Sequence, residues 1–149
     1  MLIGILYWSL TILCCGYAIV SGGRDGRWAG FMFLITSALT FPAELLGKAW
    51  GETEFLVLGV DALFLVGLYA LMLRSRRYWP IWMVGFHLVA VVTHLSTMLT
   101  PEFTPRIYRA MGSFWAIPIL LALIIGVDLD RRAGLRARAA PAGGISREP

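Results

Sequence analysis

Residues 55–73 have the sequence FLVLGVDALFLVGLYALML, in which Asp61 is the only charged residue. An apolar run of this length matches the roughly 20 residues that an α-helix needs to cross a bilayer. The chain as a whole is 58% hydrophobic over 149 residues, with a mean hydropathy of +0.74. Soluble domains are usually about 45–50% apolar. The stretch therefore predicts a transmembrane helix, and the composition predicts a membrane protein with little room for a separate soluble domain.

Four further apolar runs lie on either side of this stretch, at residues 2–21, 29–46, 79–99 and 112–128. Together the five runs predict an all-α, polytopic integral membrane bundle of five transmembrane helices within residues 1–132. The segment 133–149 is rich in Arg, Ala, Gly and Pro and lacks the apolar residues that a folded core requires, so it predicts a disordered cytoplasmic tail.

The run at residues 29–46 is the weakest of the five. Thr36, Ser37 and Thr40 dilute it, and Pro42 near its end is a residue that kinks or ends helices. A re-entrant or interfacial segment is therefore the alternative to a full crossing.

The positions of the basic residues predict the orientation of the five helices. With five crossings, all but three of the 13 Lys and Arg residues fall on one face; the other face carries only Lys48, Arg106 and Arg109. Cytoplasmic loops carry the excess of Lys and Arg, which predicts an outer N-terminus and a cytoplasmic C-terminus. If residues 29–46 did not cross, the later basic clusters would be divided between both faces, so the charge pattern also favours the second span. The Arg bias and short polytopic form are typical of bacterial proteins, which predicts a multi-pass protein of the cytoplasmic (inner) membrane.

The same arginines point to lipid rather than to nucleic acid. They lie in short loops and a tail beside apolar segments, where contact with anionic headgroups explains them best. The predicted headgroup contacts on the cytoplasmic face are Arg74, Arg76, Arg77, Arg131, Arg132, Arg136 and Arg138. We therefore expect the lipid bilayer as a partner, together with other membrane subunits or further copies of the chain, and no nucleic acid.

Asp61 is the leading candidate for an intramembrane site. A carboxylate in the middle of a transmembrane helix costs about 2.5–3.5 kcal/mol on insertion scales, so it usually faces the bundle interior and has a partner. Asp61 lies roughly 9 Å below the outer end of its run, and His94 lies roughly 8 Å below the outer end of the next. Because a short connection makes these helices antiparallel neighbours, we predict an Asp61–His94 hydrogen bond or ion pair. It serves either a proton-carrying or ion-binding role or a structural role that fixes the helix register.

Two further ionisable residues belong to this candidate site. His87 is seven residues from His94 and shares its helix face, about 10.5 Å away along the axis. Glu44 follows Pro42 and could join Asp61 and His94 if its helix packs against theirs, but no metal-binding motif links the three. One helix with this histidine spacing cannot supply both axial ligands of a single haem. We therefore predict no metal and no cofactor.

The sequence contains no phosphate-binding loop, nucleophile elbow or zinc-protease motif. The leading functional hypothesis is therefore a non-catalytic accessory or structural subunit of a larger membrane complex, and not an enzyme. The first alternative is a small oligomeric transporter, or a proton- or ion-coupled protein, that uses Asp61 and His94. The second alternative is a membrane-embedded redox or metal-binding subunit.

Overall fold

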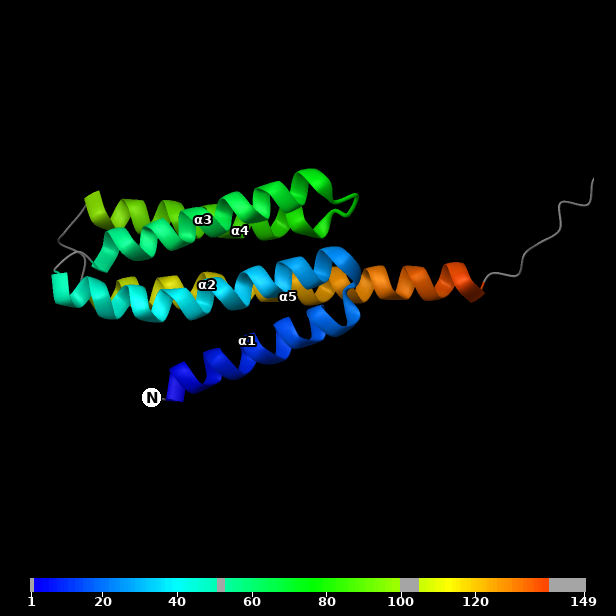
Figure 1. The fold of residues 1–149 in the computed structure, drawn as a ribbon, viewed down its shortest axis with the longest axis horizontal. Coiled ribbons are helices and arrows are strands. Elements are labelled where there is room, and N and C mark those ends of the chain that lie inside the picture. Colours follow the sequence, from blue (N-terminus) through cyan, green and yellow to red (C-terminus); the bar gives the residue numbers. More distant parts are fainter. Residues whose placement is uncertain (1, 51–52, 100–104, 140–149) are drawn as a thin grey trace, which may run out of the picture.

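The structure, a computed structural model, describes residues 2–50, 53–99 and 105–139, with side chains described for 4–40, 42, 55–96 and 114–134. Over these ranges the chain is helical and contains no strand, which confirms the predicted all-α class (Figure 1). The five helices are α1 (Leu2–Ser21), α2 (Gly23–Trp50), α3 (Thr53–Arg74), α4 (Trp79–Leu99) and α5 (Pro105–Ala139).

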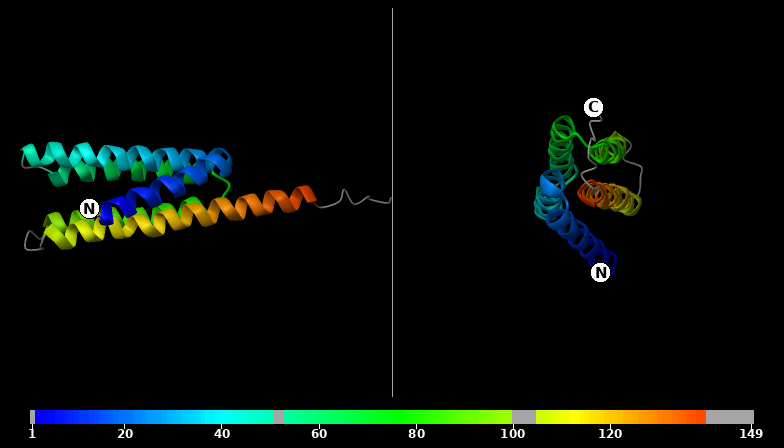
Figure 2. Two further views of the ribbon diagram at one scale, coloured as in Figure 1. Left: turned by 90° about the horizontal axis from the view of Figure 1, so that it is seen from below. Right: turned by 90° about the vertical axis from the view of Figure 1, so that its right-hand side faces the viewer.

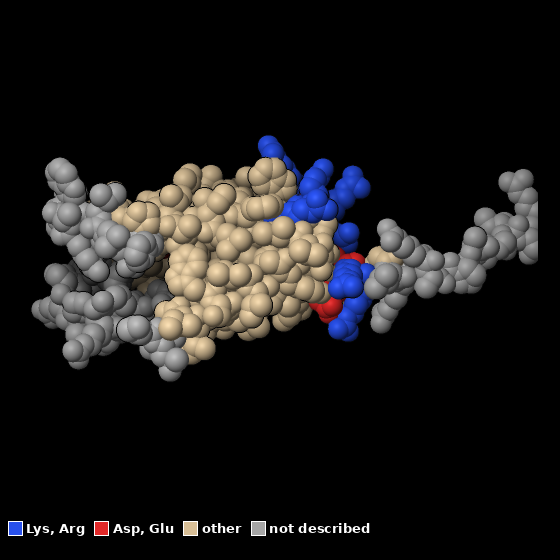
Figure 3. Space-filling model, turned by 60° about the horizontal axis from the view of Figure 1, so that its bottom comes forward, with Lys and Arg blue, Asp and Glu red and all other residues tan. Residues whose placement is uncertain are grey.

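Three of these helices are long and apolar enough to span a membrane, over Gly4–Ser21, Phe55–Arg74 and Trp79–Ser96. Large apolar side chains, such as Leu13 and Leu63, are turned outward from the bundle. Figure 3 shows a wide uncharged belt that ends at a cluster of arginines, which we call the arginine-rich end. An apolar exterior bounded by charge is the pattern of a bundle in lipid, and the three apolar helices indicate a membrane protein, as predicted.

The helices form a bundle in which each packs against the next along the chain. α3 lies between α2 and α4, and α5 packs along α4 (Figure 2). α1 packs on α2 and α5 and is inclined to the other helices (Figure 1). The side chains that fill the centre come from three different helices and are almost fully buried; they are Leu68, Met83, Leu120 and Leu123.

Small residues allow α1 and α2 to cross closely. Gly23 has φ 54°, a left-handed conformation that lets the chain reverse between the two helices within two residues. Further along α2, a Cβ on Gly30 would lie 3.1 Å from the carbonyl oxygen of Cys15. Cys15 and Ala18 on the facing side of α1 are fully buried. The contact thus depends on the absence of larger side chains at the crossing.

The second helix is longer than predicted. α2 begins at Gly23 rather than at residue 29, and it continues through Pro42 to Trp50. Proline removes the helical hydrogen bond to the carbonyl oxygen four residues before it, which for Pro42 is that of Ala38. Nearby in α2, the Thr40 hydroxyl donates to the Thr36 carbonyl oxygen at 2.9 Å. The helix therefore extends beyond the predicted run 29–46 at both ends, and Pro42 does not end it.

The fifth helix is also longer than predicted, at both ends. It begins at Pro105 instead of residue 112, and it continues past residue 132 to Ala139, where the sequence predicted a disordered tail. Proline suits the first turn of a helix. At the other end, residues 131–139 are mostly Arg, Ala and Leu, which are strong helix formers, and Pro141 follows. Composition alone underestimated the helical preference of this segment; residues 140–149 lie outside the described residues.

Candidate functional site

Asp61 on α3 and His94 on α4 are in direct contact. The His94 Nε2 lies 3.3 Å from the Asp61 Oδ2, and the two side chains are 9% and 16% exposed, respectively. The connection between the helices, residues 75–78, is short and turns α4 back along α3, which brings residues of equal depth together. The contact expected from the matched depths is present in the structure, and its role stays a prediction.

His87 binds the same residue of α3 through the backbone. Its Nε2 lies 2.9 Å from the Asp61 carbonyl oxygen, and because a carbonyl can only accept, Nε2 is the donor. The imidazole is 5% exposed, and its ring packs edge-on against Phe64 with centroids 4.7 Å apart. Both histidines of the chain therefore meet at Asp61. The sequence placed them on one helix face, but gave no signal for the backbone contact.

A layer of apolar side chains separates this cluster from the arginine-rich end. On the side toward the arginine-rich end, Met83 lies one turn from His87 on α4, and Leu68 lies two turns from Asp61 on α3. Leu120 and Leu123 of α5 complete the layer, and each of the four side chains is at most 1% exposed. A tightly packed apolar layer excludes water. In this conformation the cluster is therefore closed toward the arginine-rich end.

The structure does not place the Glu44 side chain. Its backbone belongs to α2, but the side chain lies outside the described residues. Among the described side chains, no group of three or more His, Cys, Asp or Glu residues is arranged to hold a metal ion. Cys14 and Cys15 are free and buried.

The arginines assigned to lipid contact gather at one end of the molecule (Figure 3). Arg74, Arg76 and Arg131 are exposed there. Two others are engaged in ion pairs: Arg77 Nη1 lies 3.0 Å from Asp130 Oδ1, and Arg132 Nε lies 2.8 Å from Asp128 Oδ2. The side chains of Arg136 and Arg138 lie outside the described residues.

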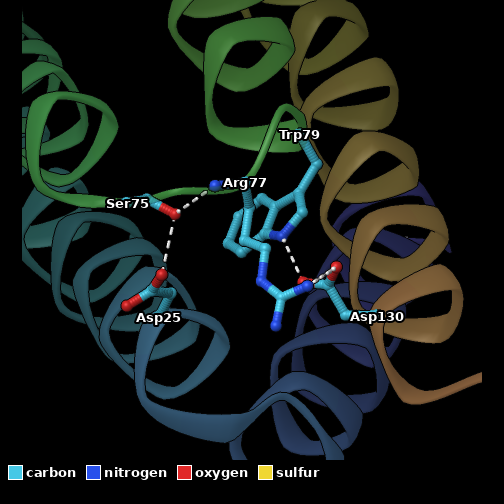
Figure 4. A network of polar contacts seen from close by, with 5 residues as sticks. All are labelled: Asp25, Ser75, Arg77, Trp79 and Asp130. Carbon is cyan, nitrogen blue, oxygen red and sulfur yellow. Dashed lines mark hydrogen bonds and ion pairs between the residues drawn. The ribbon is translucent and has the colours of Figure 1, made fainter. Parts of the chain in front are cut away.

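A polar network at the arginine-rich end links α2, the α3–α4 connection and α5 (Figure 4). The Ser75 hydroxyl donates to Asp25 Oδ2 at 2.7 Å and accepts from the Arg77 backbone N–H at 3.1 Å. Asp130 accepts from Arg77 through one carboxylate oxygen and from the Trp79 indole N–H, at 3.0 Å, through the other. A further contact joins α1 to α5, where the Tyr17 hydroxyl donates to Asp128 at 3.4 Å. The network therefore fixes the relative positions of the helices at this end.

Only part of this network could be expected from the positions of the basic residues. A count of Lys and Arg ignores the aspartates beside them: Asp25 lies in the first turn of α2, and Asp128 and Asp130 lie within α5, all at the arginine-rich end. Trp79 is the first residue of α4, where an interfacial indole would be exposed. It is only 7% exposed, because its ring lies over Gly126 of α5, where a Cβ would overlap it.

Comparison of the chain with protein-family models, with characterised proteins and with solved structures finds no match in any of the three.

Proposed function

We propose that the chain is a five-span membrane protein, with an outer N-terminus and a cytoplasmic C-terminus, that binds and releases a proton at Asp61 and His94. The single observation that carries the proposed activity is the contact between these two side chains inside an apolar bundle. An ionisable group within the membrane is a functional candidate by default, because its desolvation is expensive.

The arrangement of the helices supports the topology. α2 and α5 lie alongside the three apolar helices over most of their length (Figures 1 and 2). The exposed arginines gather at one end of all of them, which fits the excess of basic residues on the cytoplasmic face. A reporter fused after Pro149 should be active in the cytoplasm, and one inserted near Gly51 should be active outside. The reverse pattern would contradict the proposed orientation.

The surroundings of the pair support a role beyond helix register. α3 and α4 are joined by a short connection and pack along their lengths, so their register does not require an intramembrane charge. The pair has two protonation arrangements of equal net charge, carboxylate with imidazolium and carboxylic acid with neutral imidazole, and a proton moves between them within one contact. The layer formed by Leu68, Met83, Leu120 and Leu123 favours exchange of that proton with the outer side of the membrane in this conformation.

Proton flux into proteoliposomes, followed with a trapped pH-sensitive dye, tests the activity. The wild-type chain should accelerate the decay of an imposed pH gradient, and Asp61→Asn should abolish the acceleration because the amide cannot exchange a proton. Tyr69→Phe is the matched control, since it removes a polar group from an exposed position on the same helix and should leave the flux unchanged. Full flux in Asp61→Asn would show that the pair is structural, and no flux in the wild-type chain would contradict the proposed activity.

A non-catalytic subunit of a larger membrane complex is the second candidate. Two buried polar atoms, Thr11 Oγ1 on α1 and Trp115 Nε1 on α5, have no hydrogen-bond partner among the described residues. α1 is also the most inclined helix, and it exposes Ile5, Leu6 and Leu13. Incomplete hydrogen bonding together with a tilted outer helix favours a partner that repacks α1. Mild-detergent purification should then recover a stoichiometric second membrane protein, whereas a homogeneous sample of this chain alone would contradict this candidate.

A further inference from the structure

The face of α2 that points away from the bundle carries a groove near the arginine-rich end. Arg24, Arg27, Trp28 and Phe31 line it, and the open space beside them is about 350 Å³. Their spacing of three, four and seven residues puts all four on one side of the helix. The groove is therefore open to the surrounding membrane.

The opposite face of α2 confirms this direction. Gly26 faces inward, where a Cβ would lie 3.0 Å from Val127 Cγ2 on α5. Gly30 lies one turn further along and faces α1. Because these glycines mark the packed side of α2, the side chains of the groove are available to lipid rather than to a neighbouring helix of the same chain.

Two guanidinium groups lie in the part of the groove nearest to the arginine-rich end. The Arg24 side chain is 84% exposed, and its only described ion pair is a long one, with Arg24 Nε 3.7 Å from Asp25 Oδ1. The other oxygen of that carboxylate accepts the Ser75 hydroxyl. Arg27 is exposed and has no acidic partner among the side chains that the structure describes. Both arginines can therefore bind an anion, in contrast to Arg77 and Arg132, which are paired with aspartates.

The part of the groove farther from the arginine-rich end is aromatic and apolar. Trp28 is 60% exposed and Phe31 is 49% exposed, and Ile35 continues the same face at 56%. Phe31 lies seven residues from Arg24, which is roughly 10.5 Å deeper along the helix axis. Indole rings prefer the level of the membrane interface, between the headgroups and the acyl chains. The order of side chains along α2 is thus basic, amphipathic and then apolar.

We propose that this groove binds one anionic phospholipid. Arg24 and Arg27 hold its phosphate, Trp28 lies beside the glycerol region, and an acyl chain runs along Phe31 and Ile35. Guanidinium groups bind phosphate oxygens through paired, charge-assisted hydrogen bonds. An inorganic anion would leave the aromatic part of the groove uncovered, so the chemistry fits a lipid and not free phosphate. The site does not depend on the proposed role of Asp61.

Tryptophan quenching by brominated lipids tests the proposal with the full chain in phosphatidylcholine nanodiscs. A minor fraction of the lipid is replaced by brominated phosphatidylglycerol or by brominated phosphatidylcholine. The quenching that is due to Trp28 is the difference between the fluorescence quenching of the wild-type chain and that of Trp28→Phe. Phosphatidylglycerol should be preferred at Trp28 by roughly 30-fold, the scale set by two basic side chains at an anionic lipid. Arg24→Gln/Arg27→Gln should lose most of this preference.

Arg76→Gln/Arg131→Gln is the matched control, because it removes the same charge from exposed positions at the same end of the molecule. It should retain the preference, and circular dichroism should show equal helicity in both double variants. Equal loss in the control would mean that general surface charge, and not the groove, attracts the lipid. Displacement by inorganic phosphate would show a free-anion site, and a wild-type chain without preference would overturn the proposal regardless of the variants.

Discussion

The two polar regions of this molecule differ in how far their side chains are exposed. At the arginine-rich end, Asp25, Ser75, Arg77 and Asp130 are partly exposed and hold several helices together. Deep in the bundle, Asp61 is enclosed, and its described polar contacts are with the two histidines of α4. Exposed ion pairs are individually weak, because water competes with each partner. An enclosed pair interacts strongly, but it depends on both members being present.

The difference predicts where the molecule is robust and where it is fragile. A network with several exposed members can lose one contact and keep the others. Among the side chains that the structure describes, the Asp61 carboxylate has only His94 as a partner, since His87 binds the Asp61 backbone and not its side chain. Substitutions should therefore have larger effects in the enclosed region, unless they also change how closely two helices pack.

The largest expected effect follows from removing one member of the enclosed pair. His94→Leu leaves the Asp61 carboxylate without its described partner, and it should lower the free energy of unfolding by about 3 kcal/mol, the scale for breaking a buried ion pair. Asp61→Leu/His94→Leu should recover most of that loss, because two apolar side chains need no partner. Chemical unfolding in detergent, followed by circular dichroism, measures both values.

The double variant separates stability from function. If the pair carries protons, Asp61→Leu/His94→Leu should be folded and stable and yet show no proton flux in proteoliposomes. Additive effects of Asp61→Leu and His94→Leu in the double-mutant cycle would mean that the two side chains do not interact, and would contradict the contact itself.

The enclosed pair was predictable from the sequence, whereas the network was not. Depth along a transmembrane helix follows from residue number, so the apolar runs alone placed Asp61 and His94 at one level, and residues 2–21 and 79–99 coincide with α1 and α4. Contacts such as Trp79–Asp130 depend instead on which helices become neighbours and how they rotate. No local pattern encodes those choices. The ends of α2 and α5 lie beyond the apolar runs, because charged residues and proline interrupt the hydropathy there while helix propensity stays high.

The second prediction concerns the packing of α4 on α5. Gly126→Ala places a methyl group where the Trp79 ring lies, and the ring cannot move without losing its hydrogen bond to Asp130. Overpacking of this kind typically lowers the free energy of unfolding by about 1–3 kcal/mol. Gly134→Ala is the matched control on the same helix, because no atom lies near its Cβ position, and it should leave stability unchanged or slightly higher. Equal effects of the two substitutions would show that the ring does not pack on Gly126.

The smallest expected effect lies at a neutral contact. The Tyr7 hydroxyl and the Ser37 hydroxyl are 3.1 Å apart and join α1 to α2. Hydrogen bonds between transmembrane helices average about 0.6 kcal/mol in double-mutant cycles, because each group finds other partners when the helices separate. Tyr7→Phe should therefore cost about this much in the same unfolding assay, and Ser37→Ala should add little to it. A loss as large as that of His94→Leu would show that position within the membrane, and not charge, sets the cost of losing a polar contact, which would remove the distinction between the enclosed pair and the rest of the bundle.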